Sequence, residues 1–289
     1  MVSRAKLYTE ISEMLSDAGI DSARFEAQCI FEEIFKIRFP RILMNPNQNV
    51  DAESEKKIRD MVQCRINGQP LQYIIGAWEF YGYPFKVGSG VLIPRPDTET
   101  IIDEVLRICK SENLAKPRIA DLCSGSGCIA VTLKKELVNA EVFAIELSDE
   151  ALPYLRENAA LNNANINIIN GDVMKEETAH MLDELDIIVC NPPYLTEHDM
   201  TILQKEVSFE PELALYGGSD GLDYYRQITA VWKSSLKDRG YIIYEFGIDQ
   251  HEAVSRILQE NHFINIKLSR DTAGIIRTAA AQKEIGGTL

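Results

Sequence analysis

The chain has 289 residues, of which 45% are hydrophobic, which is enough to bury one large core and a smaller second domain. Its formal net charge of −14 suits a nucleic-acid backbone poorly, because binding there depends on neutralising phosphates. This charge leads us to expect no direct nucleic-acid partner. No apolar run approaches the length of a membrane span, so we also expect no membrane association.

Cysteine and histidine usage adds two expectations. The six cysteines show no C-x-x-C spacing, which predicts reduced thiols in a cytoplasmic protein. The four histidines form no cluster with the spacing of metal ligands, so no metal site is expected.

Residues 1–70 are predicted to form a small helical domain. Apolar residues recur there at helical spacing in three stretches. Asp21 can cap the second helix and Asp51 the third, which should end at Gly68-Gln69-Pro70. Periodicity predicts that these apolar stripes pack a core, and it assigns the helices no further role.

Residues 71–90 are predicted to be a hairpin linker, because aromatic residues there flank a Gly-Tyr turn. The last domain, residues 91–289, opens with prolines that hold Arg95 in a stiff extended segment. Asp97 or Thr98 can then cap an amphipathic helix.

From residue 118 onward, predicted strands alternate with predicted helices. This alternation indicates an α/β fold with a doubly wound sheet and right-handed crossovers. We expect seven strands, the last two forming an antiparallel pair at one edge. The expected strands are 119–122, 142–146, 166–169, 187–190, 241–246, 263–268 and 275–281.

A glycine-rich loop follows the first of these strands. Gly125 and Gly127 precede a helix, as in loops that bind ligands. The dinucleotide pattern G-x-G-x-x-G is absent, because Cys123 stands at its first glycine. The loop therefore favours a ligand without a pyrophosphate.

Carboxylates are predicted at the ends of three successive strands. Asp121 ends the first strand and Glu146 the second, where a carboxylate can accept hydrogen bonds from ribose hydroxyls. Asp172 follows the third strand and could accept from an adenine amino group, with Val173 against the ring. S-adenosyl-L-methionine (AdoMet) fits this pattern, since it has adenine, ribose and a sulfonium but no phosphate.

The fourth strand ends in Asn-Pro-Pro-Tyr. Pro192 and Pro193 prevent the strand from continuing, so Asn191 presents a planar amide at its carboxyl end. The Asn191 side-chain oxygen and the Pro192 carbonyl can both accept from a planar NH₂ group, on which Tyr194 can stack. The tetrapeptide resembles the signature of amino-methyltransferases.

Over nearly its full length, the chain resembles the release factor glutamine methyltransferases, the PrmC or HemK family. The resemblance lies in five motifs: Gln69-Pro-Leu-Gln-Tyr-Ile-Ile-Gly, Ile93-Pro-Arg-Pro-Asp-Thr-Glu, Asp121-Leu-Cys-Ser-Gly-Ser-Gly, Asn191-Pro-Pro-Tyr, and Glu210-Pro-Glu-Leu-Ala-Leu-Tyr-Gly-Gly-Ser-Asp-Gly-Leu-Asp-Tyr-Tyr. This family methylates N5 of the glutamine in the Gly-Gly-Gln motif of peptide-chain release factors. Its fold is a helical N-terminal domain, a hairpin and a seven-stranded AdoMet-binding domain.

The resemblance also implies the site residues. Those that would contact AdoMet are Cys123, Ser124, Gly125, Ser126, Gly127, Glu146, Asp172, Val173 and Asn191. The residues that would hold the glutamine are Asn191, Pro192, Pro193 and Tyr194. Two positions depart from the family pattern, since Cys123 replaces a glycine and Glu146 stands where aspartate is common.

An amide nitrogen is a poor nucleophile. We therefore expect Asn191, Pro192 and Tyr194 to catalyse the transfer by positioning the amide and by electrostatic stabilisation.

An adenine-N6 DNA methyltransferase is an alternative function, because it would bind the planar NH₂ group of a flipped adenine in the same way. The charge of −14 and the lack of a basic cluster oppose that alternative. A non-catalytic AdoMet-binding module is a third reading, in which Asn-Pro-Pro-Tyr would have no purpose.

Overall fold

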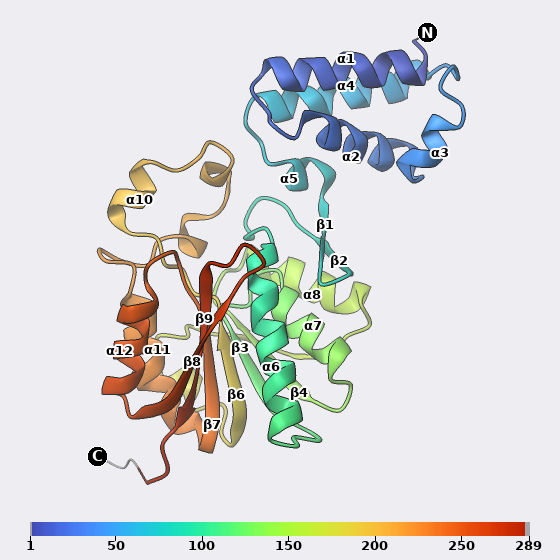
Figure 1. The fold of residues 1–289 in the computed structure, drawn as a ribbon. Coiled ribbons are helices and arrows are strands. Elements are labelled where there is room, and N and C mark those ends of the chain that lie inside the picture. Colours follow the sequence, from blue (N-terminus) through green and yellow to red (C-terminus); the bar gives the residue numbers. More distant parts are fainter. Residues whose placement is uncertain (1, 287–289) are drawn as a thin grey trace. The chain divides into compact units, whose positions relative to one another are not determined.

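The computed structural model describes residues 2–286, whose contacts divide them into two units (Figure 1). The first unit is helical and comprises the residues up to Gly76 together with Gln204–Phe209. The second contains Ala77–Leu203 and the residues from Glu210 onward. The helical unit is therefore discontinuous in sequence.

Five helices form the helical unit. They are α1 (Arg4–Asp17), α2 (Ala23–Phe35), α3 (Phe39–Leu43), α4 (Ala52–Ile66) and α5 (Leu71–Ile75). The Asp51 carboxylate caps α4 as predicted, accepting from the Ser54 N–H at 2.9 Å.

Two details of the helical unit differ from the sequence prediction. Ser22, not Asp21, is the N-cap residue of α2. Helix α5 occupies the start of the segment predicted to be a hairpin, with Pro70 as its N-cap residue. Helices α3 and α5 have five residues each, which is too short to produce a helical period in the sequence.

A buried ion pair lies inside the helical unit. Arg65 on α4 is 8% exposed and donates to the Glu26 carboxylate on α2 at 2.6 Å. Its guanidinium also donates to Glu206 at 2.9 Å. Because an unpaired buried charge is costly, these contacts stabilise the attachment of the Gln204–Phe209 segment to the helices.

The second unit contains a hairpin and a seven-stranded sheet. The hairpin pairs β1 (Ala77–Phe80) with β2 (Tyr83–Lys86). The sheet consists of β3 (Arg118–Leu122), β4 (Glu141–Glu146), β5 (Asn167–Asn170), β6 (Leu185–Cys190), β7 (Leu236–Glu245), β8 (Phe263–Arg270) and β9 (Ile276–Lys283).

The order of the sheet is β5-β4-β3-β6-β7-β9-β8, in which β3 to β7 are parallel and β9 is antiparallel to both β7 and β8. This confirms the predicted seven-stranded, doubly wound sheet with an antiparallel pair at one edge. Strand β7 begins earlier than predicted, at Leu236 instead of Tyr241. An irregularity in its pairing with β6 accommodates the polar residues between these two positions.

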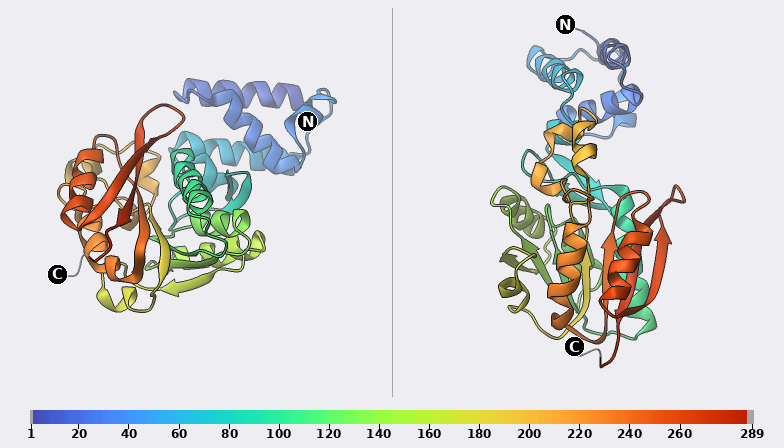
Figure 2. Two further views of the ribbon diagram at one scale, coloured as in Figure 1. Left: turned by 60° about the horizontal axis from the view of Figure 1, so that its bottom comes forward. Right: turned by 90° about the vertical axis from the view of Figure 1, so that its left-hand side faces the viewer.

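Helices cover both faces of the sheet (Figures 1 and 2). One face is packed by α6 (Glu99–Ser111), α7 (Cys128–Glu136) and α8 (Ala151–Leu161). The other is packed by α11 (Asp223–Trp232) and α12 (His251–Glu260). Two short helices, α9 (Glu176–Ala179) and α10 (Glu197–Thr201), were not predicted. Within residues 2–286, no helix is long and apolar enough to cross a membrane.

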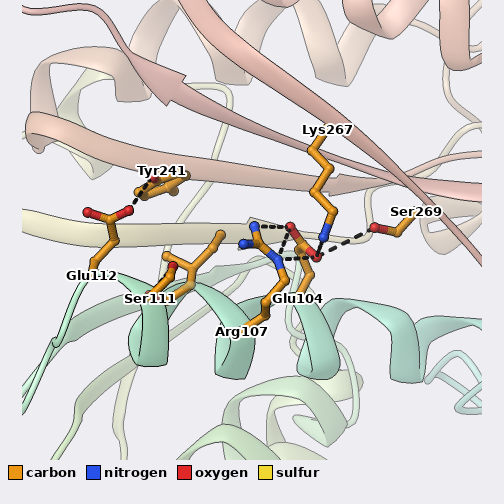
Figure 3. Close-up of polar contacts among 8 residues, drawn as sticks. Glu104, Arg107, Ser111, Glu112, Tyr241, Lys267 and Ser269 are labelled. Carbon is orange, nitrogen blue, oxygen red and sulfur yellow. Dashed lines mark hydrogen bonds and ion pairs between the residues drawn. The ribbon is translucent and has the colours of Figure 1, made fainter.

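Helix α6 is fixed to the edge strand β8 by a buried carboxylate (Figure 3). Glu104 on α6 is 4% exposed and accepts from Arg107 and from Lys267 on β8, the latter at 2.8 Å. Burial raises the pKa of Glu104, but the hydrogen bonds and charges of these two cations outweigh it and hold the pKa below its usual value. Near the other end of α6, Tyr241 donates to Glu112 at 3.0 Å.

Gly127 provides a test of the packing beneath the glycine-rich loop. Its φ is +80°, and a Cβ there would lie 2.3 Å from Cδ1 of Leu155 on α8. Gly127→Ala should lower the free energy of unfolding by about 2–4 kcal/mol, from backbone strain and overpacking together. Gly82→Ala is the matched control, because Gly82 has a φ of +77° but no neighbour within 4 Å of the added carbon. Equal losses in urea unfolding of the two variants would show that the contact with Leu155 is unimportant.

Candidate active site

A pocket lies at the carboxyl edge of the parallel strands. Leu122 of β3 pairs with Ile145 of β4 and with Cys190 of β6, so the residues that follow these strands come together. The predicted site residues that line the pocket are Cys123, Ser124, Gly125, Ser126, Glu146, Asp172, Val173, Asn191 and Pro193. Three other predicted residues, Gly127, Pro192 and Tyr194, do not line it.

Glu146 shapes the glycine-rich loop. Its carboxylate accepts from the Gly125 N–H at 2.7 Å and from the Ser148 N–H at 2.8 Å. Each carboxylate oxygen retains a further lone pair, so Glu146 can also accept from a ligand hydroxyl. Cys123, where a glycine was expected, has a φ of +60°, a conformation that a glycine adopts without strain.

Of the three predicted strand-end carboxylates, two line the pocket. Asp172 lies on the loop after β5 and accepts from the Met174 N–H at 2.9 Å. Asp121 is instead fully buried and accepts from the Ala130 N–H of α7 at 3.1 Å. Burial raises the pKa of Asp121 to about 8. The expectation that all three acids face the ligand is therefore wrong for Asp121, which instead anchors the start of α7.

Asn191 follows β6 and is oriented by Thr98. Its Nδ2 donates to the Thr98 hydroxyl at 3.2 Å. Within the described part of the chain, neither the Asn191 Oδ1 atom nor the Pro192 carbonyl oxygen accepts a hydrogen bond. Both oxygen atoms are therefore unpaired among the described residues, and their binding of a planar NH₂ group stays a prediction.

The turn after Asn191 is held by close backbone packing. A Cβ on Gly217 would lie 2.6 Å from the Pro193 carbonyl oxygen and 2.7 Å from the Tyr194 Cα, so only glycine fits there. The Tyr194 carbonyl accepts from the Gln250 side chain at 3.1 Å. Burial raises the pKa of Tyr194 to about 12, so its phenol is neutral at physiological pH.

Several pocket residues were not assigned to the site from the sequence. Glu210 is 7% exposed and accepts from the Ile93 N–H at 3.0 Å and from the Arg95 guanidinium. This carboxylate fixes the Ile93–Arg95 segment, which lines the pocket. Thr98 and Tyr224 also line it. The motifs containing Glu210 and Thr98 were recognised, but their partners are remote in sequence and gave no signal.

The lining suits AdoMet. Val91, Ile93 and Leu147 provide apolar walls for a purine, and Leu147 remains 46% exposed. Two carboxylates and no lysine line the pocket, and its one arginine is paired with Glu210. These groups favour a nucleoside that carries positive charge and no phosphate. Within residues 2–286, no group of three or more His, Cys, Asp or Glu side chains could hold a metal ion.

Comparison with known families matches both parts of the chain. Residues 6–76 match the family described as PrmC N-terminal domain. Residues 104–209 match the family described as methyltransferase small domain.

Solved structures with similar folds are methyltransferases. The catalytic domain of hMettl16 superposes with a TM-score of 0.56 and 14% identity, covering 83% of this chain and 85% of that one. The 16S rRNA N2 G1207 methyltransferase of T. thermophilus gives a TM-score of 0.52 at 17% identity, covering 72% of this chain and 50% of that one. At these identities the likeness shows the fold alone.

Relatives by sequence match almost the whole chain. The release factor glutamine methyltransferase of Fusobacterium nucleatum is 34% identical over 282 residues, covering 96% of this chain and 78% of the relative. The protein of the same name from Thermodesulfovibrio yellowstonii is 38% identical over 260 residues, covering 89% of this chain and 92% of the relative. With this identity over most of its length, the chain belongs to the release factor glutamine methyltransferase family.

Proposed function

We propose that this protein transfers a methyl group from AdoMet to the N5 side-chain amide of the glutamine in the Gly-Gly-Gln motif of peptide-chain release factors. The observation that carries the proposal is the pair of unused acceptors, Asn191 Oδ1 and the Pro192 carbonyl, beside a pocket suited to AdoMet. A primary amide has two N–H donors in one plane, which matches these two acceptors. The names of the relatives support release factors as the substrates.

When bound, AdoMet supplies an electrophilic methyl group on a sulfonium. The lone pair of the glutamine nitrogen is delocalised into its carbonyl, so the protein must favour its localisation. Asn191 and Pro192 do this by accepting both amide hydrogens, which orients the nitrogen and stabilises the positive charge it develops. No histidine lines the pocket, and the N-alkylated amide is acidic enough to lose its proton to water after the transfer.

Carboxylates of the pocket bind the methyl donor in this proposal. Glu146 accepts from the ribose hydroxyls, and Asp172 accepts from the adenine amino group beside Val173. The Tyr194 ring, which the sequence predicts to hold the amide plane, packs against the core beneath the turn. It therefore supports the position of Asn191 and Pro192 whether or not it also contacts the substrate.

The helical unit is proposed to recognise the release factor. A glutamine side chain has too few atoms to supply both affinity and selectivity, so a second contact surface is required. The unit exposes large apolar side chains, among them Phe25, Leu43 and Met44. Exposed side chains of this kind suit a protein partner, and the net charge of −14 disfavours nucleic acid.

The proposal is tested by incubating the protein with methyl-labelled AdoMet and either a release factor or duplex DNA. Label should enter the release factor and be lost when the glutamine of its Gly-Gly-Gln motif is replaced by alanine. Label in the adenine of the DNA would instead identify a DNA methyltransferase. Transfer to neither substrate, with AdoMet still bound, would favour a non-catalytic module.

Replacing Asn191 separates catalysis from cofactor binding. Asn191→Ala removes one of the two acceptors and should lower kcat by ~10²–10³, the usual loss of one preorganised polar group. AdoMet affinity should change by only a small factor. Asn139→Ala, at an exposed loop position, is the control and should leave both quantities unchanged. Equal losses of AdoMet binding and turnover in Asn191→Ala would place Asn191 in the cofactor site alone.

Replacing Glu146 tests the cofactor assignment. Glu146→Ala should weaken AdoMet binding by about 1.5–3 kcal/mol, the value of a hydrogen bond to a charged group. Glu146→Gln keeps an acceptor oxygen for only one of the two loop N–H groups, so it should bind AdoMet with intermediate affinity. Titration calorimetry that gives the wild-type affinity for both variants would show that Glu146 does not bind the ribose.

A further inference from the structure

A buried carboxylate stands behind the proposed substrate site. Glu245 ends β7 and is 2% exposed. Because Cys190 of β6 pairs with Tyr244 of β7, Glu245 and Asn191 are the next residues along two neighbouring strands. Within residues 2–286, the Glu245 Oε2 atom is buried and has no hydrogen-bond partner.

Thr98 connects these two side chains. It precedes α6, is 3% exposed, and accepts from Asn191 Nδ2 at 3.2 Å. Its side chain also lies close enough to Glu245 to favour the ionised form of that carboxylate and so to lower its pKa. The sequence suggested a helix-capping role for Thr98, but its side chain makes no capping hydrogen bond.

The charge on Glu245 decides which way the hydrogen bonds among Glu245, Thr98 and Asn191 run. An ionised carboxylate can only accept, so it favours the rotamer in which the Thr98 hydroxyl proton points toward Glu245. The Thr98 oxygen consequently offers a lone pair to Asn191 and favours Nδ2 on that side of the amide. The Asn191 Oδ1 is thereby turned away from Thr98 and left free for a substrate.

We propose that Glu245 and Thr98 are positioning residues, which fix the Asn191 amide in the one orientation that can accept a hydrogen from the substrate amide. This inference rests on the proposed function and extends it to residues outside the Asn-Pro-Pro-Tyr motif. In the flipped orientation, the Asn191 NH₂ would face the NH₂ of the substrate, and donor would oppose donor.

Glu245 also makes the positioning of the Asn191 amide depend on pH. Burial is the largest cause that raises its pKa, and the Thr98 hydrogen bond and nearby arginines oppose it, giving a value of about 7. Above this pH the carboxylate is ionised and can only accept. Below it the protonated carboxyl can itself donate to Thr98, which is then no longer restricted to accepting from Asn191. Turnover should therefore fall as the pH drops through about 7.

Other charged or titratable groups face Glu245 from the surrounding elements. They are Arg95 and Asp97 before α6, Cys128 on α7, Cys190 and Tyr194 at and after the end of β6, Tyr225 on α11 and Arg277 on β9. Burial raises the pKa values of these cysteines and tyrosines, so none of them ionises near neutrality. Arg277 is paired with Asp97 at 3.1 Å.

The test compares Thr98→Val, Thr98→Ser and Glu245→Gln in the full-length protein, with AdoMet affinity as the check on folding. Thr98→Val has the same shape without the hydroxyl and should lower kcat about 10–100-fold, while AdoMet affinity changes little. Thr98→Ser restores the hydroxyl and should recover most of the turnover. Glu245→Gln cannot ionise, so its kcat should lack the acidic limb near pH 7 that the wild type shows.

A second readout needs no substrate. The side-chain NH₂ signals of Asn191 in ¹⁵N-labelled protein, assigned by their loss in Asn191→Ala, should shift with pH around a midpoint near 7. This titration should be absent from Thr98→Val and Glu245→Gln. If Thr98→Val shows wild-type turnover, or if the wild-type NH₂ signals do not titrate, the inference is wrong. If the wild type does not methylate a release factor, the proposed function fails, and the NH₂ titration still decides the inference.

Discussion

The site depends on the parallel pairing of β4, β3, β6 and β7. Buried apolar strands fix the register of this sheet, because a slip would move their side chains to the wrong face. Cys123, Glu146, Asn191 and Glu245 are distant in sequence, but each lies at or just after the end of one of these strands. The sheet therefore brings together the residues proposed to bind the methyl donor and those proposed to bind the substrate amide.

The opposite wall of the pocket is built differently. It comes from segments with little regular structure, the residues from Val91 to Thr98 and those that follow Glu210. A few specific contacts fix these segments, above all the buried Glu210 carboxylate that binds Ile93 and Arg95. The close approach of Gly217 to Pro193 and Tyr194 fixes the turn between the two walls. Small changes at these points would alter the site more than larger changes in the helices.

The sequence predicted most of this architecture where the signal is local. Apolar runs and alternation identified the seven strands, and the glycine loop and Asn-Pro-Pro-Tyr located part of the pocket. Short helices such as α9 and α10 were missed because four or five residues carry no helical period. Asp121 was misplaced because a strand-end carboxylate can face either a ligand or the first turn of the next helix. Only the fold distinguishes these alternatives.

Thr98 shows the limit of local reasoning most directly. A threonine before an amphipathic helix is typical of a cap, but its partner here is Asn191, 93 positions away. The same limit applies to Glu210 and Ile93, which are joined across 117 positions. Such contacts are properties of the tertiary structure and have no short-range pattern.

The discontinuous helical unit has a consequence for how the protein could be divided. The segment Gln204–Phe209 belongs to that unit, where Arg65 binds Glu206, yet its next residue is Glu210. Cleavage of the backbone after Gly76 would therefore not release the helices by itself, since they would keep this non-covalent hold on the remaining polypeptide. Exchanging the unit between relatives would need both of its segments, because Glu206 of the second segment pairs with Arg65 of the first. The helical unit is thus encoded by two stretches of one gene, which the stretch for Ala77–Leu203 separates.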